Sequence, residues 1–522
     1  MVINLILTVT GAGGYSKSMA LHFLFVYPDF LENTKHVRGI PGNYSEGIAS
    51  ISATLKREGH SVSLYHQTYM PDKRDFVLKI RAYHPDIIGF SLRTTIMACA
   101  AEMLGWLNEA LPEIPVIAGG YHPTLAPEEV IALPGVDIVS RGEGEFPLRD
   151  LINGFDRTGY FNTSEPGFWF KQPDGTVIRN VMRPYPADLD ELPFPDLDLF
   201  DYQNLKSNRI GTAEVIVSRG CLYSCTYCAN ANIRNTYEEK RSYARFRSPE
   251  NAAELLARVL RKDPGVKYLN FNDAILNMFP EWFYSFMKLY KERVNLKFTC
   301  NLRFDHIDEE MCRVLADCGC YLVTIGLENG SEDFRKKYLR RSMNNAHIVK
   351  VAHWLREAGI RVYTYNIVGL PFETLALTLE TVKLNARLQA DNEIVSFFCP
   401  YPATDLRDIS IAGGFLKPGA PLSGKVFLRM PDYPRHDIIY ARYSFHRLVR
   451  AYRKIYRDPD PAKVAKREAG LDRRILSPRH PRLIIGVLRA LGHHTIVGLK
   501  RISARFTPVL YRKLRQLKYS AN

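Results

Sequence analysis

Three cysteines in the middle of the chain carry the strongest chemical signal in the sequence. Cys221, Cys225 and Cys228 have the spacing C-x3-C-x2-C, and the aromatic Tyr227 directly precedes the last of them. Three thiolates can bind three irons of a [4Fe-4S] cube and leave the fourth iron open for a small molecule. The spacing therefore predicts an iron–sulfur cluster with one free coordination position.

A structural zinc site and a disulfide framework fit these cysteines less well. A structural zinc site needs four ligands, usually from two C-x2-C pairs, and the sequence contains no second pair. Nine cysteines among 522 residues are also an odd and sparse set for disulfides. The sequence therefore favours the cluster.

The net charge of +15 belongs to the C-terminal part of the chain. From Phe415 onward there are 25 Lys and Arg but 6 Asp and Glu, and no acidic residue follows Asp472. A chain of 522 residues can form two to four domains, each with its own core. We expect residues 1–20 to be an extension, because they lack the basic start and the cleavage site of a signal peptide. The sequence has no run of 18 uncharged apolar residues, so we expect no membrane-spanning helix.

Residues 21–155 alternate between strand-like and helix-like segments. Short apolar runs mark five strands, and a helical pattern from Tyr44 to Gly59 follows the first of them. This alternation predicts a doubly wound, flavodoxin-like α/β domain with a parallel sheet. Ligands bind such sheets at the carboxyl ends of the strands. The predicted strands are 22–28, 61–65, 86–91, 116–120 and 137–140.

Residues 156–205 are rich in Pro, Gly and Asp and are expected to form a linker. Residues 206–405 again alternate between strands and helices, which predicts a (β/α)6 partial TIM barrel with its chemistry at the carboxyl ends of the strands. Ser248 as the cap and Pro249 in the first helical position mark the start of its first helix. Residues 406–522 are expected to be basic and mainly helical. The six predicted barrel strands are 214–218, 268–272, 297–301, 321–326, 361–368 and 393–399.

The cysteine motif, the α/β domain ahead of it and the polar ends of the barrel strands resemble the cobalamin-binding-domain radical S-adenosylmethionine (SAM) family over residues 21–405. In that family the open iron chelates SAM, and reductive cleavage yields a 5'-deoxyadenosyl radical. The resemblance identifies Cys221, Cys225 and Cys228 as the cluster ligands and residues 21–155 as a cobalamin-binding domain. The residues that would bind cobalamin lie in three loops and are Ser91, Arg93, Thr94, Thr95, Gly119, Gly120, Tyr121, His122, Gly142, Glu143, Gly144 and Glu145.

The ends of successive barrel strands resemble the SAM-binding series of the same family. Asn272 and Asp273 follow the second strand, where the family holds the SAM amino group, although many cobalamin-dependent relatives have two aspartates there. Glu328 would approach the ribose or the amino group, and Arg335 would pair with the carboxylate through its bidentate guanidinium. The other predicted SAM-binding residues are Tyr227, Arg303, Ile367, Gly369 and Glu373.

Other polar residues have simpler interpretations. Cobalamin mutases carry a cobalt-ligating histidine in a loop where an aspartate orients it, but here Thr34 replaces the aspartate, so we expect His36 to be a solvated loop residue. The three cysteines in 312–320 are expected to be packed thiols and not a second cluster. Cys399 ends the sixth strand at the mouth of the barrel. It is either a packed thiol or a donor of a proton or hydrogen atom, and beyond the cluster no other catalytic residue is predicted.

The C-terminal region combines apolar and basic residues. Two apolar runs, 483–488 and 495–499, are separated by Arg489, His493 and His494 and do not form one membrane span. Basic amphipathic helices of this kind bind anionic membrane surfaces. A solvated helical cap on the barrel fits the composition equally well. A nucleic-acid-binding arm fits it less well, because aliphatic residues outnumber stacking aromatic ones.

The resemblance also predicts the reaction. The adenosyl radical would abstract hydrogen from an unactivated carbon, and methylcobalamin would then give a methyl group to the carbon radical. An oxidative cyclase similar to the anaerobic Mg-protoporphyrin IX monomethyl ester cyclase family is the alternative enzyme, and a non-catalytic cobalamin or redox sensor is the alternative of another class. A tRNA methylthiotransferase is excluded, because it would need a second cysteine triad and Cys99 is the one cysteine of the N-terminal domain.

The expected cofactors are a [4Fe-4S] cluster, SAM and cobalamin. The expected partners are a small-molecule or lipid substrate, an electron donor such as flavodoxin or ferredoxin, and an anionic membrane surface, whereas nucleic acid is not expected. A thiolate cluster favours a reducing cytoplasm. We therefore expect a cytoplasmic protein that associates with the inner face of the membrane through its basic C-terminal region.

Overall fold

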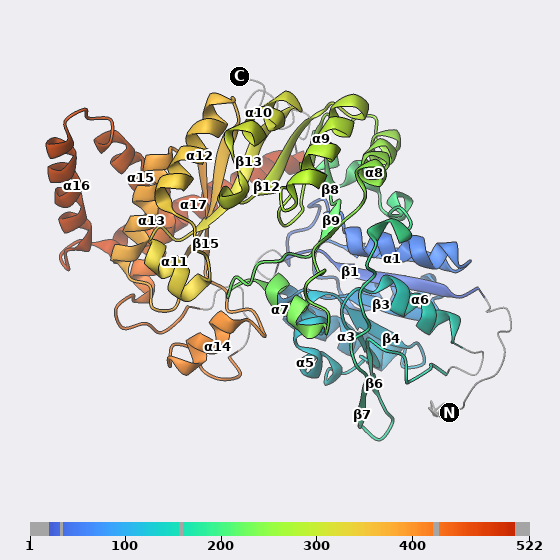
Figure 1. Ribbon diagram of the computed structural model, residues 1–522. Coiled ribbons are helices and arrows are strands. Elements are labelled where there is room, and N and C mark those ends of the chain that lie inside the picture. Colours follow the sequence, from blue (N-terminus) through green and yellow to red (C-terminus); the bar gives the residue numbers. More distant parts are fainter. Residues whose placement is uncertain (1–19, 32–34, 156–159, 421–426, 507–522) are drawn as a thin grey trace.

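The computed structural model describes residues 20–31, 35–155, 160–420 and 427–506. Two α/β units lie side by side, and helices from the C-terminal part of the chain pack on the second unit (Figure 1). Apart from Ala20, the predicted extension 1–20 lies outside the described residues. The two successive units, each built on a largely parallel sheet, confirm the predicted α/β class.

The first unit has the predicted doubly wound, flavodoxin-like order. Its five parallel strands follow one another as β2-β1-β3-β4-β5, so the direction of winding reverses between β1 and β3. The central strands β1, β3 and β4 are largely apolar because helices and loops cover both faces of the sheet, whereas β2 at the sheet edge mixes polar and apolar residues. The strands are β1 (His22–Pro28), β2 (Ser61–Gln67), β3 (Ile87–Ser91), β4 (Val116–Gly119) and β5 (Ile138–Ser140). The helices are α1 (Glu46–Arg57), α2 (Lys73–Ala82), α3 (Met97–Ala110), α4 (Tyr121–Leu125), α5 (Pro127–Ile131) and α6 (Glu145–Asn153).

The prediction of a linker over 156–205 is wrong in part, because the segment contributes two strands to the first sheet. β6 (Phe168–Lys171) pairs antiparallel with β5, and β7 (Val177–Arg179) pairs antiparallel with β6. Phe168, at the start of β6, is fully buried, and Gly175 makes the hairpin turn with a φ of +83°. The short apolar run of β6 stands among Pro, Gly and Asp, so the overall composition concealed the hairpin.

The second unit is the predicted (β/α)6 partial barrel. Its six strands are all parallel and follow the order β8-β11-β12-β13-β14-β15. The predicted first strand is split, because β8 ends at Val215 and a separate short strand, β9, begins at Ser218 and pairs antiparallel with β10. The strands are β8 (Thr212–Val215), β11 (Tyr268–Phe271), β12 (Lys297–Leu302), β13 (Cys320–Glu328), β14 (Arg361–Val368) and β15 (Asn392–Phe397). The helices are α8 (Pro249–Lys262), α9 (Pro280–Arg293), α10 (Glu309–Asp317), α11 (Glu332–Leu339), α12 (Asn345–Glu357) and α13 (Leu375–Leu388). The insertion between β8 and α8 carries β9 (Ser218–Arg219), α7 (Ala229–Thr236) and β10 (Arg245–Phe246).

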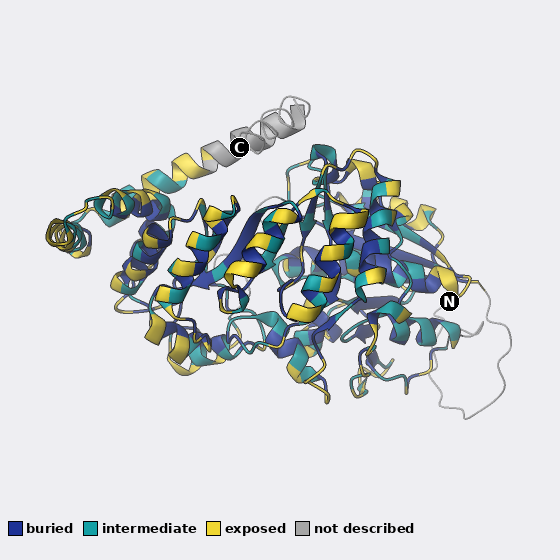
Figure 2. Ribbon diagram, turned by 45° about the horizontal axis from the view of Figure 1, so that its top comes forward, coloured by how far each residue is buried: buried dark blue, intermediate teal, exposed yellow. Residues whose placement is uncertain are grey.

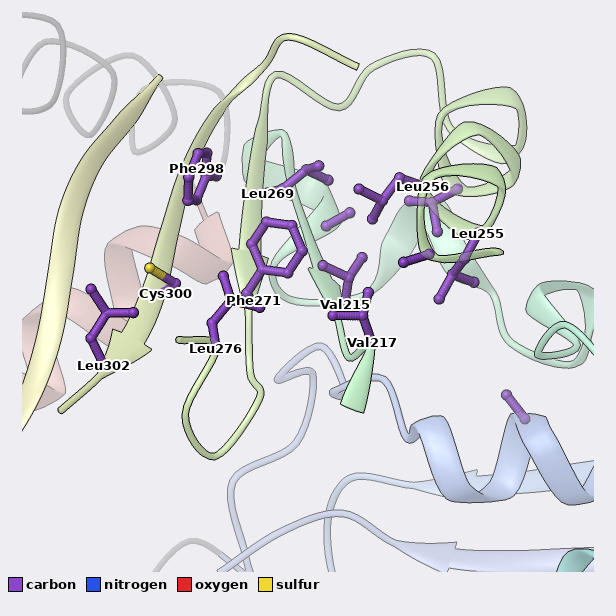
Figure 3. Packing of buried hydrophobic residues seen from close by; sticks show 14 of the residues in the cluster. Val215, Val217, Leu255, Leu256, Leu269, Phe271, Leu276, Phe298, Cys300 and Leu302 are labelled. Atoms are coloured by element: carbon purple, nitrogen blue, oxygen red, sulfur yellow. The ribbon is translucent and has the colours of Figure 1, made fainter. Parts of the chain in front are cut away.

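Apolar side chains between the barrel strands and the outer helices hold the strand ends in place. α8 starts as predicted, with a hydrogen bond from the backbone to the Ser248 hydroxyl, and it turns Leu255 and Leu256 toward the sheet (Figure 3). Phe271 of β11 is fully buried and packs edge-on against Phe298 of β12, with ring centroids 5.5 Å apart. Burying one such ring contributes about 1.5–3 kcal/mol. This packing fixes the edge of the sheet at which the polar residues gather.

The described part of the C-terminal region is mainly helical, as predicted. α15 packs against α13 and β15, and α17 packs along α15. The first turns of α17 expose many residues on the outside of the molecule (Figure 2). Within the described residues, no helix is both long and apolar enough to cross a membrane. The helices are α14 (Asp405–Ala412), α15 (Arg435–Ile455), α16 (Pro461–Leu476) and α17 (Arg482–Phe506).

Candidate functional site

The three predicted cluster ligands lie on the single loop that joins β9 to α7. Cys221 and Cys225 are buried, and Cys228 is half-buried as the N-cap of α7. The chain enters the loop at Gly220, whose φ is +83°. A side chain at this position would collide with the carbonyl group of Tyr243, so the turn requires glycine.

The chemistry of the three thiols suits an iron–sulfur cube. Burial raises the pKa of Cys228 to about 11 and also raises the pKa of Cys221, so iron has to displace the protons on binding. The sulfurs are close enough for their charges to interact. Nevertheless, no three His, Cys, Asp or Glu side chains of the described residues converge as a single metal ion would require. In a cube each thiolate binds a different iron, so the three sulfurs need not converge.

A cavity of about 240 Å³ opens beside the cysteine loop, at the carboxyl ends of β13, β14 and β15. Three predicted SAM-binding residues, Tyr227, Glu328 and Ile367, line it together with Cys399. The cavity therefore joins the loop of the cluster ligands to the strand ends at which SAM binding is predicted. The remaining lining residues are Tyr365, Asn366, Ser396, Phe397, Phe398 and Tyr401.

Glu328 holds a strained backbone conformation in the wall of this cavity. Its φ is +65°, and the pairing of β13 with β14 shifts register between Gly326 and Glu328. Residues other than glycine occupy this region only where the surroundings enforce it, and such residues cluster at functional sites. Burial raises the pKa of Glu328, whose carboxylate lies near Tyr227 and Arg341. The end of β13 therefore directs a buried carboxylate toward the cysteine loop.

The two polar residues that follow β11 have different surroundings. The buried carboxylate of Asp273 accepts hydrogen bonds from the Val217 N–H, at 3.0 Å, and from the Ser218 hydroxyl. Its Oδ2 has no hydrogen-bond partner within the described residues, and burial raises the pKa of Asp273 to about 6. A free buried acceptor of this kind suits an ammonium group. Asn272 is instead exposed and accepts a hydrogen bond from Asn270, so the structure does not bring it into the same site.

Arg335 does not reach the cavity, so its predicted contact with the SAM carboxylate is wrong. It is fully buried and donates hydrogen bonds to the carbonyl groups of Asn329 and Met343, both at 2.7 Å, and to Asn345 Oδ1 at 2.6 Å. The backbone around the end of α11 needs these donors, because buried carbonyl groups without a partner are costly. Arg335 therefore holds the loop after α11 in shape.

Arg303 lies beside the cysteine loop but is already paired with a protein carboxylate. Its Nε and a terminal nitrogen donate to Asp305 at 2.8 and 2.6 Å. Its guanidinium also lies over the ring of Tyr223, at 3.5 Å from the centroid. Arg303 thus lies at the predicted strand end. The carboxylate that it binds is that of Asp305, where the prediction expected the carboxylate of a ligand.

Gly369 and Glu373 shape the turn after β14 and do not line the cavity, so their predicted place near the adenine stays a prediction. The buried carboxylate of Glu373 accepts hydrogen bonds from the N–H groups of Gly369 and Leu370 and from the Thr378 hydroxyl, at 2.7, 3.1 and 2.9 Å. Gly369 has a φ of +82° and lies against Ile438 of α15. Burial raises the pKa of Glu373 to about 7 despite these donors.

A buried cation that the sequence analysis did not single out takes part in the site. Arg341 donates hydrogen bonds to the Tyr227 hydroxyl, at 3.3 Å, and to the Cys225 sulfur, at 3.6 Å. It follows the end of α11, where Arg340 adopts a left-handed φ of +53°. The pair of adjacent arginines was a signal in the sequence, but spacing alone does not tell which one turns inward.

Two of the three predicted cobalamin loops lie together at the carboxyl ends of β3 and β4. The N–H of Leu92 donates to the carbonyl of Gly119 at 2.8 Å, which ties the loops together. Gly120 is exposed with a φ of +111°, and Tyr121 is 60% exposed. Ser91 and Thr95 are half-buried at the same edge. This open, glycine-containing edge leaves room for a flat ligand such as cobalamin.

Three other residues of these loops, Arg93, Thr94 and His122, use their side chains for contacts with other protein groups. These contacts argue against direct contact with cobalamin. His122 is fully buried, and its Nδ1 shares a hydrogen bond of 3.0 Å with the Thr94 hydroxyl. Arg93 donates to the carbonyl of Pro28 and pairs with the buried Asp29, at 3.2 and 3.3 Å. These side chains form the floor of the loops.

The third predicted cobalamin loop turns its two acidic side chains toward the second unit, so these side chains are not free to bind a ligand. Glu143 and Glu145 pair with Arg219, which stands directly before Gly220 of the cysteine loop. The N···O distances are 2.9 Å to Glu143 and 2.5 Å to Glu145, and Arg245 pairs with Glu143 as well. Acidic residues after a strand suggested ligand contacts, but the sequence did not reveal that two arginines of the other unit would face them.

The two glycines of the same loop pack closely, and Gly142 does so against the second unit. A side chain on Gly142 would collide with the ring of Tyr237 in the second unit, and one on Gly144 would lie 2.9 Å from Ile51 of α1. The Tyr237 hydroxyl also accepts a hydrogen bond from the N–H of Glu143, at 3.0 Å. The loop after β5 therefore contacts the second unit through Gly142, Glu143 and Glu145, while Gly144 packs within the first unit. We call the ion pairs of Arg219 and Arg245 with Glu143 and Glu145 the interdomain network.

Other sequence predictions agree with the structure. His36 is an exposed loop residue. Cys312 is buried on α10, and Cys318 and Cys320 donate weak hydrogen bonds to backbone carbonyl groups, as packed thiols do.

Two family models match the chain, one on each unit. The model of the B12 binding domain matches residues 44–152, and the model of the radical SAM superfamily matches residues 215–384. These ranges lie inside the predicted domains 21–155 and 206–405, whose boundaries stay predictions.

Relatives and solved structures resemble this chain over most of its length. An uncharacterized methyltransferase of Pyrococcus horikoshii is 25% identical over 399 residues, which are 76% of this chain and 84% of the relative. The anaerobic magnesium-protoporphyrin IX monomethyl ester cyclase of Rubrivivax gelatinosus is 24% identical over 401 residues, or 74% of this chain and 69% of the cyclase. The cobalamin-dependent SAM radical enzyme OxsB, solved with aqua-cobalamin and SAM bound, superposes with a TM-score of 0.64 at 17% identity. That match covers 96% of this chain and 81% of OxsB, and it shows a shared fold.

The chain therefore contains a B12-binding domain followed by a radical SAM domain, which confirms the resemblance drawn from the sequence. The predicted cofactors are confirmed with it: a [4Fe-4S] cluster and SAM for the second domain, and cobalamin for the first. The roles of the individual SAM and cobalamin residues stay predictions where the structure leaves their side chains free.

The interdomain network should be sensitive to the loss of one charge. We expect Arg219→Met to lower the free energy of unfolding by about 3–5 kcal/mol, because it leaves the buried Glu145 without its arginine and Glu143 with Arg245 as its remaining partner. The double variant Arg219→Met/Glu145→Gln should lose less than the sum of the two single variants. Urea unfolding of the four proteins measures this coupling. The exposed pair of Arg179 with Glu128 provides the control, and equal effects of Arg219→Met and Arg179→Met would contradict the expectation.

Glu373 should make stability depend on pH. Its pKa is raised to about 7 from an ordinary value of 4.5, so the folded protein binds the proton more tightly than the unfolded chain, and stability falls as pH rises between these values. Each unit of such a shift corresponds to roughly 1.4 kcal/mol. We therefore expect the stability advantage of the wild type over Glu373→Gln to shrink by up to roughly 3 kcal/mol from pH 5 to pH 8. Urea unfolding at both pH values tests this, and an advantage that grows with pH would contradict it.

Proposed function

Because this chain is a radical SAM enzyme with a B12-binding domain, we propose that it transfers a methyl group to an unactivated carbon of its substrate. The observation that carries the proposal is the contact between the two domains at the cysteine loop. α4, which begins at Tyr121 of the open cobalamin edge, packs against α7, which begins directly after Cys228. The edge that suits cobalamin therefore adjoins the loop that suits the cluster.

The residues of the chain have separate tasks in this proposal. The three cysteines of the loop bind the cluster, while Asp273, with its free Oδ2, and Glu328 hold the polar groups of SAM. The aromatic side chains in the wall of the cavity receive the reacting part of the substrate and exclude water. When bound, the cofactors supply the adenosyl radical and the methyl group. The protein supplies the geometry in which both reach the same carbon.

The alternative enzyme is an oxidative cyclase, which the similarity to the Rubrivivax gelatinosus protein supports. Such an enzyme would use the same two domains but would leave no new methyl group on its product. A non-catalytic sensor is the third alternative, and it would not cleave SAM. These three differ in the fate of the SAM methyl group and of its adenosyl group.

We propose further that the substrate is a lipid or another apolar small molecule, and that the enzyme works in the cytoplasm at the inner membrane surface. α17 has a stripe of exposed apolar side chains at helical spacing, while Ile485 and Gly486 on its other face pack toward α15. From residue 473 to the end of the chain there are 12 Lys and Arg and no Asp or Glu. Apolar residues next to positive charge are what an anionic bilayer attracts. The stripe consists of Leu483, Ile484, Val487, Leu488 and Leu491.

The proposed enzyme needs a reductant as its second partner. A small electron-transfer protein such as flavodoxin or ferredoxin would supply the electron to the cluster. Leu222 of the cysteine loop is 38% exposed, so the loop is accessible from the surface.

Methyl transfer is tested with anaerobically purified protein whose cluster has been reconstituted. We expect about one cobalamin per chain by ultraviolet–visible spectroscopy, conversion to the methyl form after SAM and reductant are added, and a deuterated methyl group in the product when CD3-labelled SAM is used. Cys228→Ala should bind cobalamin as before but release no 5'-deoxyadenosine, whereas Cys318→Ala should behave like the wild type. Cleavage of SAM without bound cobalamin would contradict methyl transfer, and an oxidised product without label would establish the cyclase alternative.

Membrane binding is tested by sedimentation with vesicles of phosphatidylcholine alone and with added phosphatidylglycerol. We expect binding to the anionic vesicles and release by salt, because screening weakens the attraction of the basic residues. Ile484→Asp/Leu488→Asp should weaken binding at least about tenfold, because it places charge in the apolar stripe. Leu78→Asp on α2 is the control, since Leu78 is 54% exposed and lies outside the stripe. Equal binding to both kinds of vesicle would overturn this part of the proposal.

A further inference from the structure

Arg341 is the one side chain in the described part of the chain that the structure links directly to both a cluster ligand and the wall of the cavity. Its Nη1 donates to Cys225 Sγ at 3.6 Å and to the Tyr227 hydroxyl at 3.3 Å. Its Nη2 donates to the carbonyl of Gly326 at 2.6 Å. The side chain is 95% buried, since the residue is 5% exposed. A guanidinium buried in this way keeps a fixed position.

The surrounding chain is built to place this guanidinium. α11 ends at Leu339, Arg340 takes a left-handed conformation, and the N–H of Arg341 donates to the carbonyl of Arg335 at 3.0 Å. Arg335 in turn ties the loop to the end of β13 through its own hydrogen bonds. At Gly326 a side chain would lie 3.3 Å from Nη2 of Arg341, so glycine leaves the guanidinium its space.

The charge of Arg341 is permanent. A guanidinium keeps its proton in proteins, and that of Arg341 is held by its hydrogen bonds to the Tyr227 hydroxyl and the Gly326 carbonyl. Its Nε has no hydrogen-bond partner within the described residues, so the two terminal nitrogens make the contacts. A fixed positive charge therefore faces the sulfur of one predicted cluster ligand.

We infer that Arg341 is a positioning residue that raises the reduction potential of the cluster through its hydrogen bond to Cys225 Sγ. Reduction adds an electron to the cluster, and a donor with positive charge at a ligand sulfur stabilises the more negative, reduced state more than the oxidised one. The potential of a cluster depends on hydrogen bonds to its sulfurs, on net charge and on exposure. The inference rests on the predicted cluster ligands and not on methyl transfer, so it can fail while the proposed function stands.

The test is a redox titration of the reconstituted cluster, followed by electron paramagnetic resonance without substrate or cobalamin. Arg341→Gln should bind the same amount of iron and sulfide as the wild type but have a more negative midpoint potential. Arg341→Lys, which keeps the charge but loses the planar fork, should shift the potential less and in the same direction. Arg340→Gln is the matched control, because its side chain is 54% exposed and pairs with Asp405, and it should leave the potential unchanged.

Each outcome decides the inference. A loaded Arg341→Gln variant with the potential of the wild type would overturn it. If Arg341→Gln binds no iron, the Arg341→Lys variant decides: a negative shift supports the inference, whereas an unchanged potential or failure to load shows that Arg341 only holds the loop. An equal shift in Arg340→Gln would also overturn the inference, because the effect would then come from general surface charge.

Discussion

Arg219 and Arg245 meet Glu143 and Glu145 between the two α/β units, and the position of the cysteine loop depends on this interdomain network. Removing two arginines and two carboxylates from water costs desolvation free energy, which offsets much of the electrostatic attraction between them. The network is therefore better understood as a device that fixes geometry than as a source of stability. Because Arg219 is followed directly by Gly220 and Cys221, the first domain holds the strand from which the cluster ligands depart.

This constraint explains why the loop after β5 differs from the other two loops of the first sheet. At the ends of β3 and β4, Gly120 and Tyr121 are exposed, as residues that bind a ligand must be. The loop at the end of β5 instead contacts the second unit. One sheet edge thus divides its strands between binding a cofactor and binding a domain. The division brings α4 against α7, so that the ligand edge and the cysteine loop adjoin.

Most of the fold could be predicted from the sequence, because the spacing of apolar residues along the chain reflects which side chains are buried. β1 and β14 were predicted with their observed bounds, and the start of α8 at Ser248 followed from its cap. The β6–β7 hairpin was missed because its apolar run is too short to stand out against the prolines and glycines around it. In the site, Glu328 was found from its place at the end of a strand and Tyr227 from its place in the cysteine motif, and both line the cavity. Residues whose partner lies on the other domain, such as Glu143, were not found, because sequence spacing contains no information about that partner.

The arginines after β13 are a second case in which sequence spacing did not identify the partner of a side chain. Arg335, Arg340 and Arg341 all follow the strand closely, and a carboxylate-binding cation could be any of them. The three arginines have different partners in the structure. Arg335 donates to buried backbone carbonyl groups, and Arg340 remains at the surface. Arg341 turns inward and donates to Cys225 and Tyr227. The position at which α11 ends decides this, because ending it one residue later would rotate the inward side chain by about 100° around the helix. Capping geometry, more than residue type, therefore selects which positive charge faces the cluster ligands.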